Sequence, residues 1–413
     1  MKMNKKIKII LLFLCSFIVY NSYGSDLSVA HAYRYAVMKK AKGSDILLLG
    51  EVFENNNSLE SRIYESFLFD EKRIVIAKIS SHINKEKIRA KGFCSSIISD
   101  LKAENILLWQ RNNGGWPKEP HNNFSGYNRA QTEKEKVLAL STKNSTDTTI
   151  DNNHTVGEIK YLLKAYKLTN NINYLTGAIK GVDYLLVAQY DNGGWPQYYP
   201  DKSAYRHQIT FNDNAMVNVM NLMWDISKGI NNTDVLDVKY KEKAINAFAK
   251  GIDIILQTQI SIDGKKTGWC AQYDEVTLLP ALARSYELPS ISGSESVGIV
   301  RVLMLVENPS FEIIHSIHSA VDWFNKVKIK DLGIQKTFNP EDMKVVSKPG
   351  NIMWARFYDL KTQQPFFSGR DGVKKNTLAE IEIERRVGYA WYVKGPNKLI
   401  GTQYTKWKSK HGL

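Results

Sequence analysis

The sequence is poor in cysteine, and this scarcity limits the sites that the chain can build. Only three cysteines occur among 413 residues, and Cys15 falls in an N-terminal apolar run. For Cys94 and Cys270, one disulfide and two buried thiols are equally open. No cysteine and histidine spacing matches a zinc-type centre, so the sequence excludes that class of site.

A long apolar run is also missing. The apolar run at residues 9–20 is too short to span a bilayer comfortably. It follows four lysines within residues 1–8 and precedes small residues at 22–24, a pattern typical of a secretory signal peptide. We therefore expect residues 1–24 to be a signal peptide. The mature protein would then be secreted to the periplasm or the medium, as a monomer without stable membrane association.

Acidic residues are fewer than basic ones, which gives a formal net charge of +14. Removing the four lysines of the signal peptide lowers this charge to +10. An exported basic protein with 21 tyrosines and 9 tryptophans favours an acidic polymer as its partner. Nucleic acid has the same charge sign, but the chain carries no recognisable nucleic-acid-binding motif and export argues against it.

Strand signals are few and short, whereas apolar residues recur at helical spacing over much of the chain. The clearest predicted helices cover residues 155–168, 174–189, 213–226 and 240–257. We expect an all-α dominated fold with long polar loops, such as 121–149 and 203–212. The predicted organisation is a helical leader segment at 25–90 and one large catalytic domain at 91–413.

A glycine–tryptophan signature repeats along this domain. Asn-Gly-Gly-Trp-Pro occurs at 113–117 and at 192–196, and a looser Thr-Gly-Trp occurs at 267–269. The tryptophans lie 79 and then 74 residues apart, and each follows a helical stretch that ends near a glutamine. A repeat of this length holds about two helix pairs, so we expect a helical array that places the tryptophans on a common face.

Aromatic side chains on that face would offer flat surfaces to sugar rings. Trp116, Trp195 and Tyr273 are the candidates for this role in substrate binding. The competing interpretation is that each ring belongs to the hydrophobic core.

Two aspartates flanked by asparagines begin successive helical stretches. Asp151 precedes one predicted helix and Asp213 begins another. Either one alone reads most simply as a helix N-cap. Two such aspartates on successive repeats indicate instead a shared site for a hard cation, since calcium accepts carboxylate and amide oxygens and tolerates open positions.

Four arginines lie among aromatic and apolar residues, where an unpaired cation would be costly. They are Arg284, Arg301, Arg356 and Arg370. Each one needs an anion beside it. Because the planar guanidinium matches a carboxylate through two hydrogen bonds, a uronic acid is a suitable ligand.

Several of these segments together resemble the pectate lyases of polysaccharide lyase family 10. The matching segments are 109–117, 209–216, 268–273, 286–293 and 366–372. They occur in the family's order, and the resemblance covers roughly residues 90–392. The segment before residue 90 lies outside it, and Asn152-Asn153-His154 gives the metal loop bulkier polar residues than the family pattern.

The resemblance implies an (α/α) toroid-like or barrel-like helical fold, Ca²⁺ dependence and cleavage of polygalacturonate by β-elimination. It assigns Asp151 and Asp213 to calcium and makes Arg284 the catalytic base. Arg356 and Arg370 would hold substrate, and we add Arg301 to that set.

An arginine base is chemically demanding because the reference pKa of arginine is about 12.5 or higher. We expect calcium and neighbouring arginines to depress the pKa of Arg284, and activity to be greatest at alkaline pH. Two other functions stay open. An inverting glycoside hydrolase could use Asp151, Asp213 or Glu287 as its two carboxylates, and a pectin-binding protein could keep the basic cleft without turnover.

Overall fold

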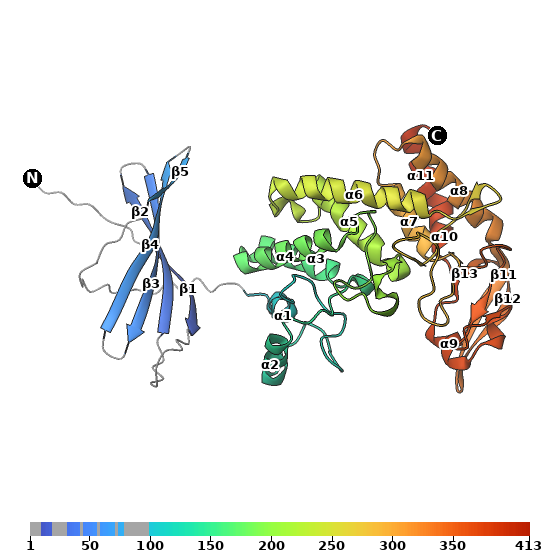
Figure 1. Ribbon diagram of the computed structural model, residues 1–413, viewed down its shortest axis with the longest axis horizontal. Coiled ribbons are helices and arrows are strands. Elements are labelled where there is room, and N and C mark those ends of the chain that lie inside the picture. Colours follow the sequence, from blue (N-terminus) through green and yellow to red (C-terminus); the bar gives the residue numbers. More distant parts are fainter. Residues whose placement is uncertain (1–9, 19–30, 42–43, 56–57, 71–72, 78–98) are drawn as a thin grey trace, which may run out of the picture. The chain divides into compact units, whose positions relative to one another are not determined.

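The computed structural model describes residues 10–18, 31–41, 44–55, 58–70, 73–77 and 99–413 (Figure 1). The chain divides into two compact units, Met1–Ser95 and Ser96–Leu413. The second unit begins close to the expected domain boundary at residue 91.

The first unit contains an antiparallel sheet with the strand order β1-β2-β3-β4-β5. The strands are β1 Ile10–Ile18, β2 His31–Ala41, β3 Ser44–Asn55, β4 Ser58–Asp70 and β5 Arg73–Ala77. The prediction of a helical leader at 25–90 is therefore wrong. Short apolar runs fit a strand as well as a helix, and here pairing between neighbouring strands provides the backbone partners. β1 lies within residues 1–24, for which the signal peptide stays a prediction.

Helices dominate the second unit, which confirms the predicted fold class (Figure 1). They are α1 Leu101–Trp109, α2 Glu133–Ser141, α3 Val156–Thr169, α4 Ile172–Ala188, α5 Ala215–Lys228, α6 Val238–Thr258, α7 Glu295–Leu303, α8 Phe311–Val327, α9 Ile383–Gly388, α10 Gly395–Lys398 and α11 Tyr404–His411. The pairs α3–α4, α5–α6 and α7–α8 pack together. Contacts between successive pairs join α3, α5 and α7 into one row and α4, α6 and α8 into another.

Helix α2 lies inside the segment 121–149 that the sequence predicts as a loop. Its apolar residues do not form a buried stripe, since Val137 and Leu140 are exposed. The helix depends instead on a capping box, in which Thr132 and Glu135 satisfy each other's backbone N–H groups. That Thr-x-x-Glu pattern was the available signal for this helix.

Short strands tie the loops between helices to one another. They are β6 Ile209–Thr210, β7 Ser261–Ile262, β8 Lys265–Lys266, β9 Gln272–Tyr273, β10 Ile291–Ser292, β13 Phe357–Tyr358, β14 Phe367–Ser368, β15 Lys374–Lys375 and β16 Tyr392–Val393. One long hairpin, β11 Ile329–Phe338 and β12 Glu341–Ala355, is inserted after α8. The pairs β6–β9 and β10–β13 link loops of successive repeats on one side of the helical array.

Each signature tryptophan is buried and donates its indole N–H to a carbonyl of the helix that precedes it. The pairs are Trp116 to Ile106 (2.7 Å), Trp195 to Leu185 (2.8 Å), Trp269 to Ile255 (2.7 Å) and Trp354 to Phe324 (2.8 Å). Trp354 is a fourth copy that the sequence does not reveal, because the hairpin β11–β12 separates it from its helix.

A glutamine joins each of the first three signature loops to a helix of the row formed by α4, α6 and α8. The side-chain amides of Gln110, Gln189 and Gln259 each donate to two backbone carbonyls, one in the loop and one in that helix. Gly181 of α4 leaves room for the ring of Trp116, which would lie 2.9 Å from an added Cβ. The repeat therefore fixes both the loop and its helix neighbour.

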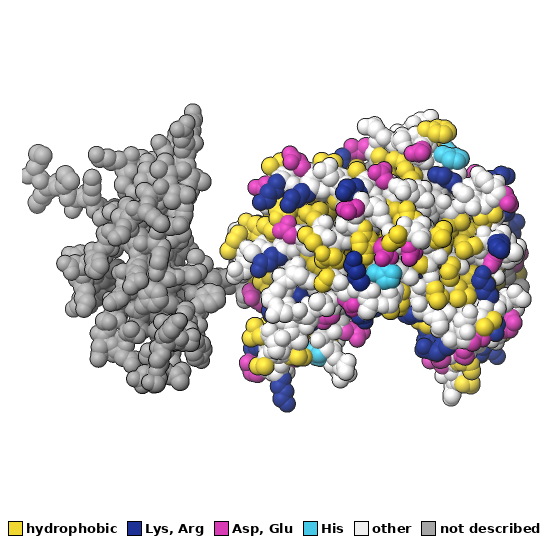
Figure 2. Space-filling view, in the orientation of Figure 1, with side chains coloured by type: hydrophobic (Ala, Val, Ile, Leu, Met, Phe, Trp, Pro, Cys, Tyr) yellow, Lys and Arg dark blue, Asp and Glu magenta, His cyan; other side chains and the backbone are white. Residues whose placement is uncertain are grey.

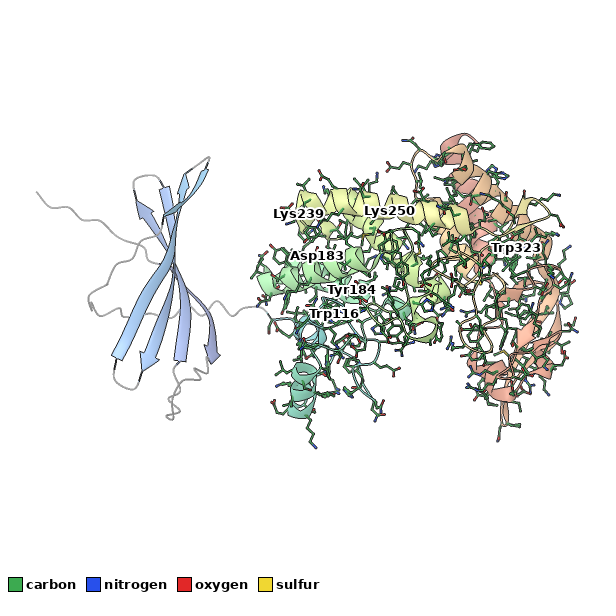
Figure 3. All side chains as sticks on the ribbon, in the orientation of Figure 1. Trp116, Asp183, Tyr184, Lys239, Lys250 and Trp323 are labelled. Atoms are coloured by element: carbon green, nitrogen blue, oxygen red, sulfur yellow. The ribbon has the colours of Figure 1, made fainter. Side chains whose placement is uncertain are left out.

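The expectation that Trp116, Trp195 and Tyr273 face sugar rings is wrong. Both indoles are fully buried, and Figure 3 places Trp116 among the packed side chains beside Tyr184. Tyr273 is buried as well and donates its hydroxyl to the carbonyl of Thr258. These rings belong to the core because each polar atom finds a backbone partner there.

Cys270 is a buried thiol, and burial raises its pKa. Cys94 lies outside the described residues, so one disulfide and two buried thiols both stay open for this pair. Among the described residues, no helix combines the length and hydrophobicity needed to cross a membrane.

Replacing Trp195 by Phe tests the indole hydrogen bond. We expect the free energy of unfolding to fall by roughly 2–4 kcal/mol, because the change leaves the Leu185 carbonyl unpaired and creates a small cavity. Trp224→Phe is the control. Trp224 is half-buried against Phe248 and has no indole hydrogen bond within the described part of the chain. Its replacement by Phe should lower the free energy of unfolding by at most about 1 kcal/mol. Urea unfolding followed by circular dichroism measures both; equal costs would contradict the prediction.

Candidate active site

Two tight turns bring the candidate metal residues together. Asp151 opens the turn Asp151–Asn153 before α3, and Asp213 is the central residue of the turn Asn212–Asn214 before α5. The two turns contact each other. The helix N-caps that follow are Thr155 and Asn214, so neither aspartate is the N-cap of its long helix. The simpler interpretation of these aspartates is therefore wrong.

The two carboxylates differ in what they contact. One oxygen of Asp151 accepts a hydrogen bond from Lys118 Nζ at 2.7 Å, while Oδ1 is buried without a partner in the described structure. Asp213 accepts from Asn212 at 3.2 Å and from Arg356 at 3.3 Å. Burial opposes the charge on Lys118, but Asp151 and Asp213 outweigh it and raise its pKa.

These oxygens fit a hard cation. Oδ1 of Asp151 is a buried carboxylate oxygen without a hydrogen-bond partner among the described residues, and calcium prefers oxygen ligands of this kind. Within the described residues, no group of three or more His, Cys, Asp or Glu side chains is arranged to hold a metal. A calcium ion here would therefore take further ligands from water or substrate.

Arg356 is the most deeply buried cation of the site, and Glu295 lies beside it. Its Nη2 donates to Glu295 at 2.6 Å and to Asn212 at 3.0 Å. Burial opposes its charge, but Glu295 and Asp213 outweigh this effect and hold the pKa of Arg356 above its usual value. Its Nε is buried without a partner among the described residues. The guanidinium therefore keeps donors that no described protein group satisfies.

Arg284 is paired with a buried glutamate. Its Nε donates to Glu287 Oε2 at 2.7 Å, and its Nη2 donates to the other carboxylate oxygen. Glu287 also accepts the hydroxyl hydrogen of Tyr389 at 2.9 Å. The hydrogen bond to Glu287 holds the pKa of Arg284 above its usual value. Among the described residues the nearest charged partner of Arg284 is a carboxylate, so the neighbouring arginines do not depress this pKa as expected. The expected effect of calcium on it stays a prediction.

Aromatic rings link the two arginines. The ring of Tyr389 lies 4.4 Å from the Arg356 guanidinium carbon and 6.0 Å from that of Arg284. Tyr286 is buried, with its ring 5.0 Å from Arg284. Burial raises the pKa of Tyr205, which also senses the charges of Arg284 and Asp151. Electrostatic coupling thus connects the arginine pair to the aspartate turns.

The other two predicted arginines, Arg370 and Arg301, are more exposed than Arg356 and Arg284. Arg370 is exposed and donates from Nε to Glu384 of α9 at 2.6 Å. Its loop lies against the Arg284 loop, since an added Cβ at Gly372 would meet the carbonyl of Ser285 at 3.3 Å. Arg301 is exposed in the last turn of α7 and donates to the neutral side chain of Gln403. No carboxylate pairs with Arg301 within the described part of the chain, so the prediction of an anion beside it is wrong there; its exposure leaves the charge open to solvent.

The sequence missed three further residues that line this cluster or support it. Lys118 directly follows the first signature loop, whose Asn-Gly-Gly-Trp-Pro pattern was a usable signal. Glu295 and Tyr389 gave no local signal, because each reaches the site only through packing against distant segments.

Figure 2 shows a hollow along the lower edge of this unit, between the part that carries α2 and the part that carries α9. Arg370 pairs with Glu384 of α9, in the second of these parts.

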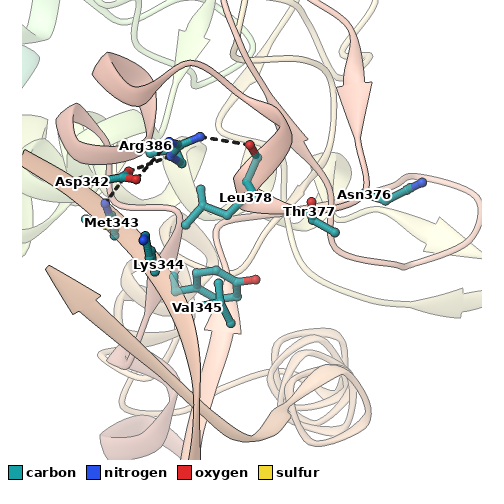
Figure 4. A pocket seen from close by; sticks show the side chains of 10 residues that line it. Asp342, Met343, Lys344, Val345, Asn376, Thr377, Leu378 and Arg386 are labelled. Atoms are coloured by element: carbon teal, nitrogen blue, oxygen red, sulfur yellow. Dashed lines mark hydrogen bonds and ion pairs between the residues drawn. The ribbon is translucent and has the colours of Figure 1, made fainter. Parts of the chain in front are cut away.

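A separate cavity of about 550 Å³ lies between β12 and the segment before α9 (Figure 4). Arg386 lines this cavity and donates from Nε to Asp342, another lining residue, at 2.9 Å. None of the predicted site residues lines this cavity. A smaller one, of about 310 Å³, includes Asn152 and Glu158 and lies beside the turn of Asp151.

Known proteins resemble this chain in sequence and in fold. A family model described as pectic acid lyase matches residues 110–400. The family 10 polysaccharide lyase from Cellvibrio cellulosa is 33% identical, with a TM-score of 0.66 over 74% of this chain and 92% of that chain. An aspartate-to-alanine mutant of a family 10 polysaccharide lyase from Cellvibrio cellulosa, in complex with trigalacturonic acid, is 32% identical with the same TM-score and coverage. No curated protein matches the chain.

The matched segment contains Lys118, both aspartate turns, Arg284, Arg356 and Arg370. It spans well over half of the chain, and the solved relatives extend the agreement to the fold. The chain therefore belongs to the pectic acid lyases of polysaccharide lyase family 10, and it is a pectate lyase.

Proposed function

We propose that this protein is a secreted, calcium-dependent pectate lyase that cleaves polygalacturonate by β-elimination. The observation that carries this proposal is the grouping of two arginines, Arg284 and Arg356, around Tyr389 with Asp213 in contact with one of them. A bound trisaccharide of the same acid in a similar lyase supports the choice of substrate.

Substrate carboxylates would bind to the cations of the site. Arg356 has donors without a partner among the described residues, and its burial strengthens any hydrogen bond that it makes to a carboxylate. Arg370 can exchange Glu384 for substrate at little cost, because an exposed ion pair contributes little free energy. Lys118 adds a third positive charge beside the aspartates.

The reaction removes the C5 proton of a galacturonate unit. The electron pair of the C5–H bond forms the C4–C5 double bond, the C4–O bond breaks, and the leaving oxygen takes a proton from solvent. Negative charge builds up on the C6 carboxylate as the proton leaves. Arginine donors directed at that carboxylate stabilise the transition state more than the ground state.

Calcium would be held by Asp151 and Asp213, with Asn212 nearby as an amide. When bound, it would supply positive charge next to the substrate carboxylate. The orphaned oxygen of Asp151 supports this assignment.

Arg284 is the proposed base, and it must be neutral to accept a proton. Glu287 favours its charged form, so the neutral fraction at neutral pH is small. Ion pairing also argues against an inverting hydrolase. Glu287 is bonded to Arg284, Asp151 to Lys118 and Asp213 to Arg356, so none of the three carboxylates is free to act as a general acid.

Secretion is proposed from residues 1–24 alone, whose lysines, apolar run and small residues are typical of a signal peptide.

Activity on polygalacturonate tests the proposal directly. With calcium at alkaline pH, we expect steady growth of ultraviolet absorbance from the unsaturated product, and loss of that growth when a chelator is added. New reducing ends without absorbance would indicate a hydrolase. Polymer binding without either signal would indicate a binding protein.

Arg284→Lys tests the base. We expect kcat to fall roughly 1000-fold or more, because the ammonium cannot place a neutral nitrogen where the guanidine nitrogen lies. Arg386→Lys, at a two-point ion pair with Asp342 outside the site, is the matched control and should keep wild-type kcat. Near-normal activity of the Arg284 variant would rule out this role.

The pH profile follows from the raised pKa of Arg284. Its neutral fraction grows as the pH rises toward that pKa, so kcat should increase from neutral pH to the most alkaline pH at which the protein stays folded. Initial rates at saturating calcium and substrate measure this dependence. An optimum below neutral pH would contradict an arginine base.

Asp151→Asn tests the calcium site. We expect the calcium concentration for half-maximal activity to rise roughly tenfold or more, since calcium affinity follows the charge of its ligands. Asp234→Asn, at an exposed surface ion pair with Lys167, is the control and should leave the calcium dependence unchanged. An unchanged calcium dependence in Asp151→Asn would show that calcium binds elsewhere.

A further inference from the structure

Glu287 leaves one side of the Arg284 guanidinium without a partner. Nε–H and Nη2–H both donate to the Glu287 carboxylate. Nη1 has no hydrogen-bond partner within the described part of the chain. The two occupied nitrogens fix the plane of the guanidinium, so the direction of Nη1 is fixed as well.

Glu287 is itself held in place. Its side chain is buried, and Oε1 accepts the hydroxyl hydrogen of Tyr389 at 2.9 Å. Its Oε2 also accepts the backbone N–H of Arg284 at 3.2 Å, and its own backbone N–H donates to the carbonyl of Arg284 at 2.7 Å. The carboxylate is therefore a rigid acceptor that the guanidinium must meet in one orientation.

A neutral guanidine carries its basic lone pair on the one nitrogen that has lost a proton. The carboxylate of Glu287 accepts hydrogen bonds but donates none, so Nε keeps its only hydrogen and Nη2 keeps the hydrogen that faces the carboxylate. Loss of the second Nη2 hydrogen would weaken that bond, because an imine N–H is a poorer donor, whereas Nη1 makes no bond to Glu287 that could be weakened. The lone pair then resides on Nη1. A buried carboxylate selects the reactive tautomer of a histidine base by the same physical logic in serine proteases.

We infer that Glu287, held by Tyr389, is a positioning residue that orients Arg284 and places its basic nitrogen at Nη1. This inference rests on the proposed role of Arg284 as the base. The residue does not touch the reacting atoms, and it acts only through Arg284.

Glu287 has a second effect that opposes the first. The titratable groups that face Arg284 are Glu287, Tyr286, Tyr389 and Tyr205, and Glu287 is the carboxylate among them. It favours the charged guanidinium and so decreases the fraction of neutral base at a given pH. Loss of Glu287 should therefore lower the rate through misorientation while moving the rise of activity toward lower pH.

Glu287→Gln in the full chain separates these effects. The amide can accept only one of the two N–H groups, and its own NH₂ faces the other. We expect kcat to fall roughly 100-fold, KM to stay within about threefold, and the alkaline rise of kcat to move to lower pH. The readout is unsaturated product from polygalacturonate at saturating calcium, measured over the full pH range.

Tyr389→Phe provides an independent variant. It removes one hydrogen bond to Glu287 but keeps the ring against Arg356. The carboxylate then interacts more strongly with Arg284. We therefore expect a smaller fall in kcat and a shift of the alkaline rise to higher pH, opposite to the shift in Glu287→Gln. This opposite sign is difficult to obtain from a general loss of stability.

The matched control is Asp342→Asn, which disrupts a comparable two-point ion pair with Arg386 outside the site. Its kcat and pH profile should equal those of the wild type. Absence of unsaturated product from the wild type would refute the proposed function itself. A wild type that is active, with Glu287→Gln either unchanged or reduced without any shift of the pH profile, would overturn the positioning role alone.

Discussion

The indole N–H of each signature tryptophan must find an acceptor once the ring is buried, and the rest of the structure depends on how this is achieved. In all four copies the acceptor is a carbonyl of the preceding helix. A buried N–H without a partner would be costly. The hydrogen bond therefore restricts the path that the loop takes between the end of the helix and the tryptophan. The residues that follow each tryptophan then pair with neighbouring loops, and these pairings build one face of the helical array.

That constraint accounts for the position of the most buried arginine. Arg356 lies two residues after Trp354, the fourth signature tryptophan, and its backbone carbonyl accepts the N–H of Gly293. The backbone around it is fixed by the hydroxyl of Tyr358, which accepts from Ala355, as Tyr273 accepts from Cys270 in the third copy. The inserted hairpin changes the sequence distance between helix and tryptophan but leaves the local geometry of the copy unchanged.

Charge at the site is organised in pairs of unequal burial. Buried Arg356 faces buried Glu295, half-buried Arg284 faces buried Glu287, and exposed Arg370 faces exposed Glu384. Buried pairs persist because a charge left without its partner in the interior is strongly destabilising, whereas the exposed pair can open at little cost. The site thus combines two arginines held in fixed orientations with one that can move to a ligand.

The sequence by itself determined the helical class of the main unit and four of its helices within a few residues, and it singled out Asp151 and Asp213, whose turns contact each other. These features follow from local periodicity and from motifs that carry their own geometry. The sequence could not show that Trp116 and Trp195 are core residues, because burial depends on the helix packed above each loop. Nor could it bring Glu287, Glu295 and Tyr389 to the arginines. Such contacts join segments far apart in the chain, so only tertiary packing decided which carboxylate pairs with which cation.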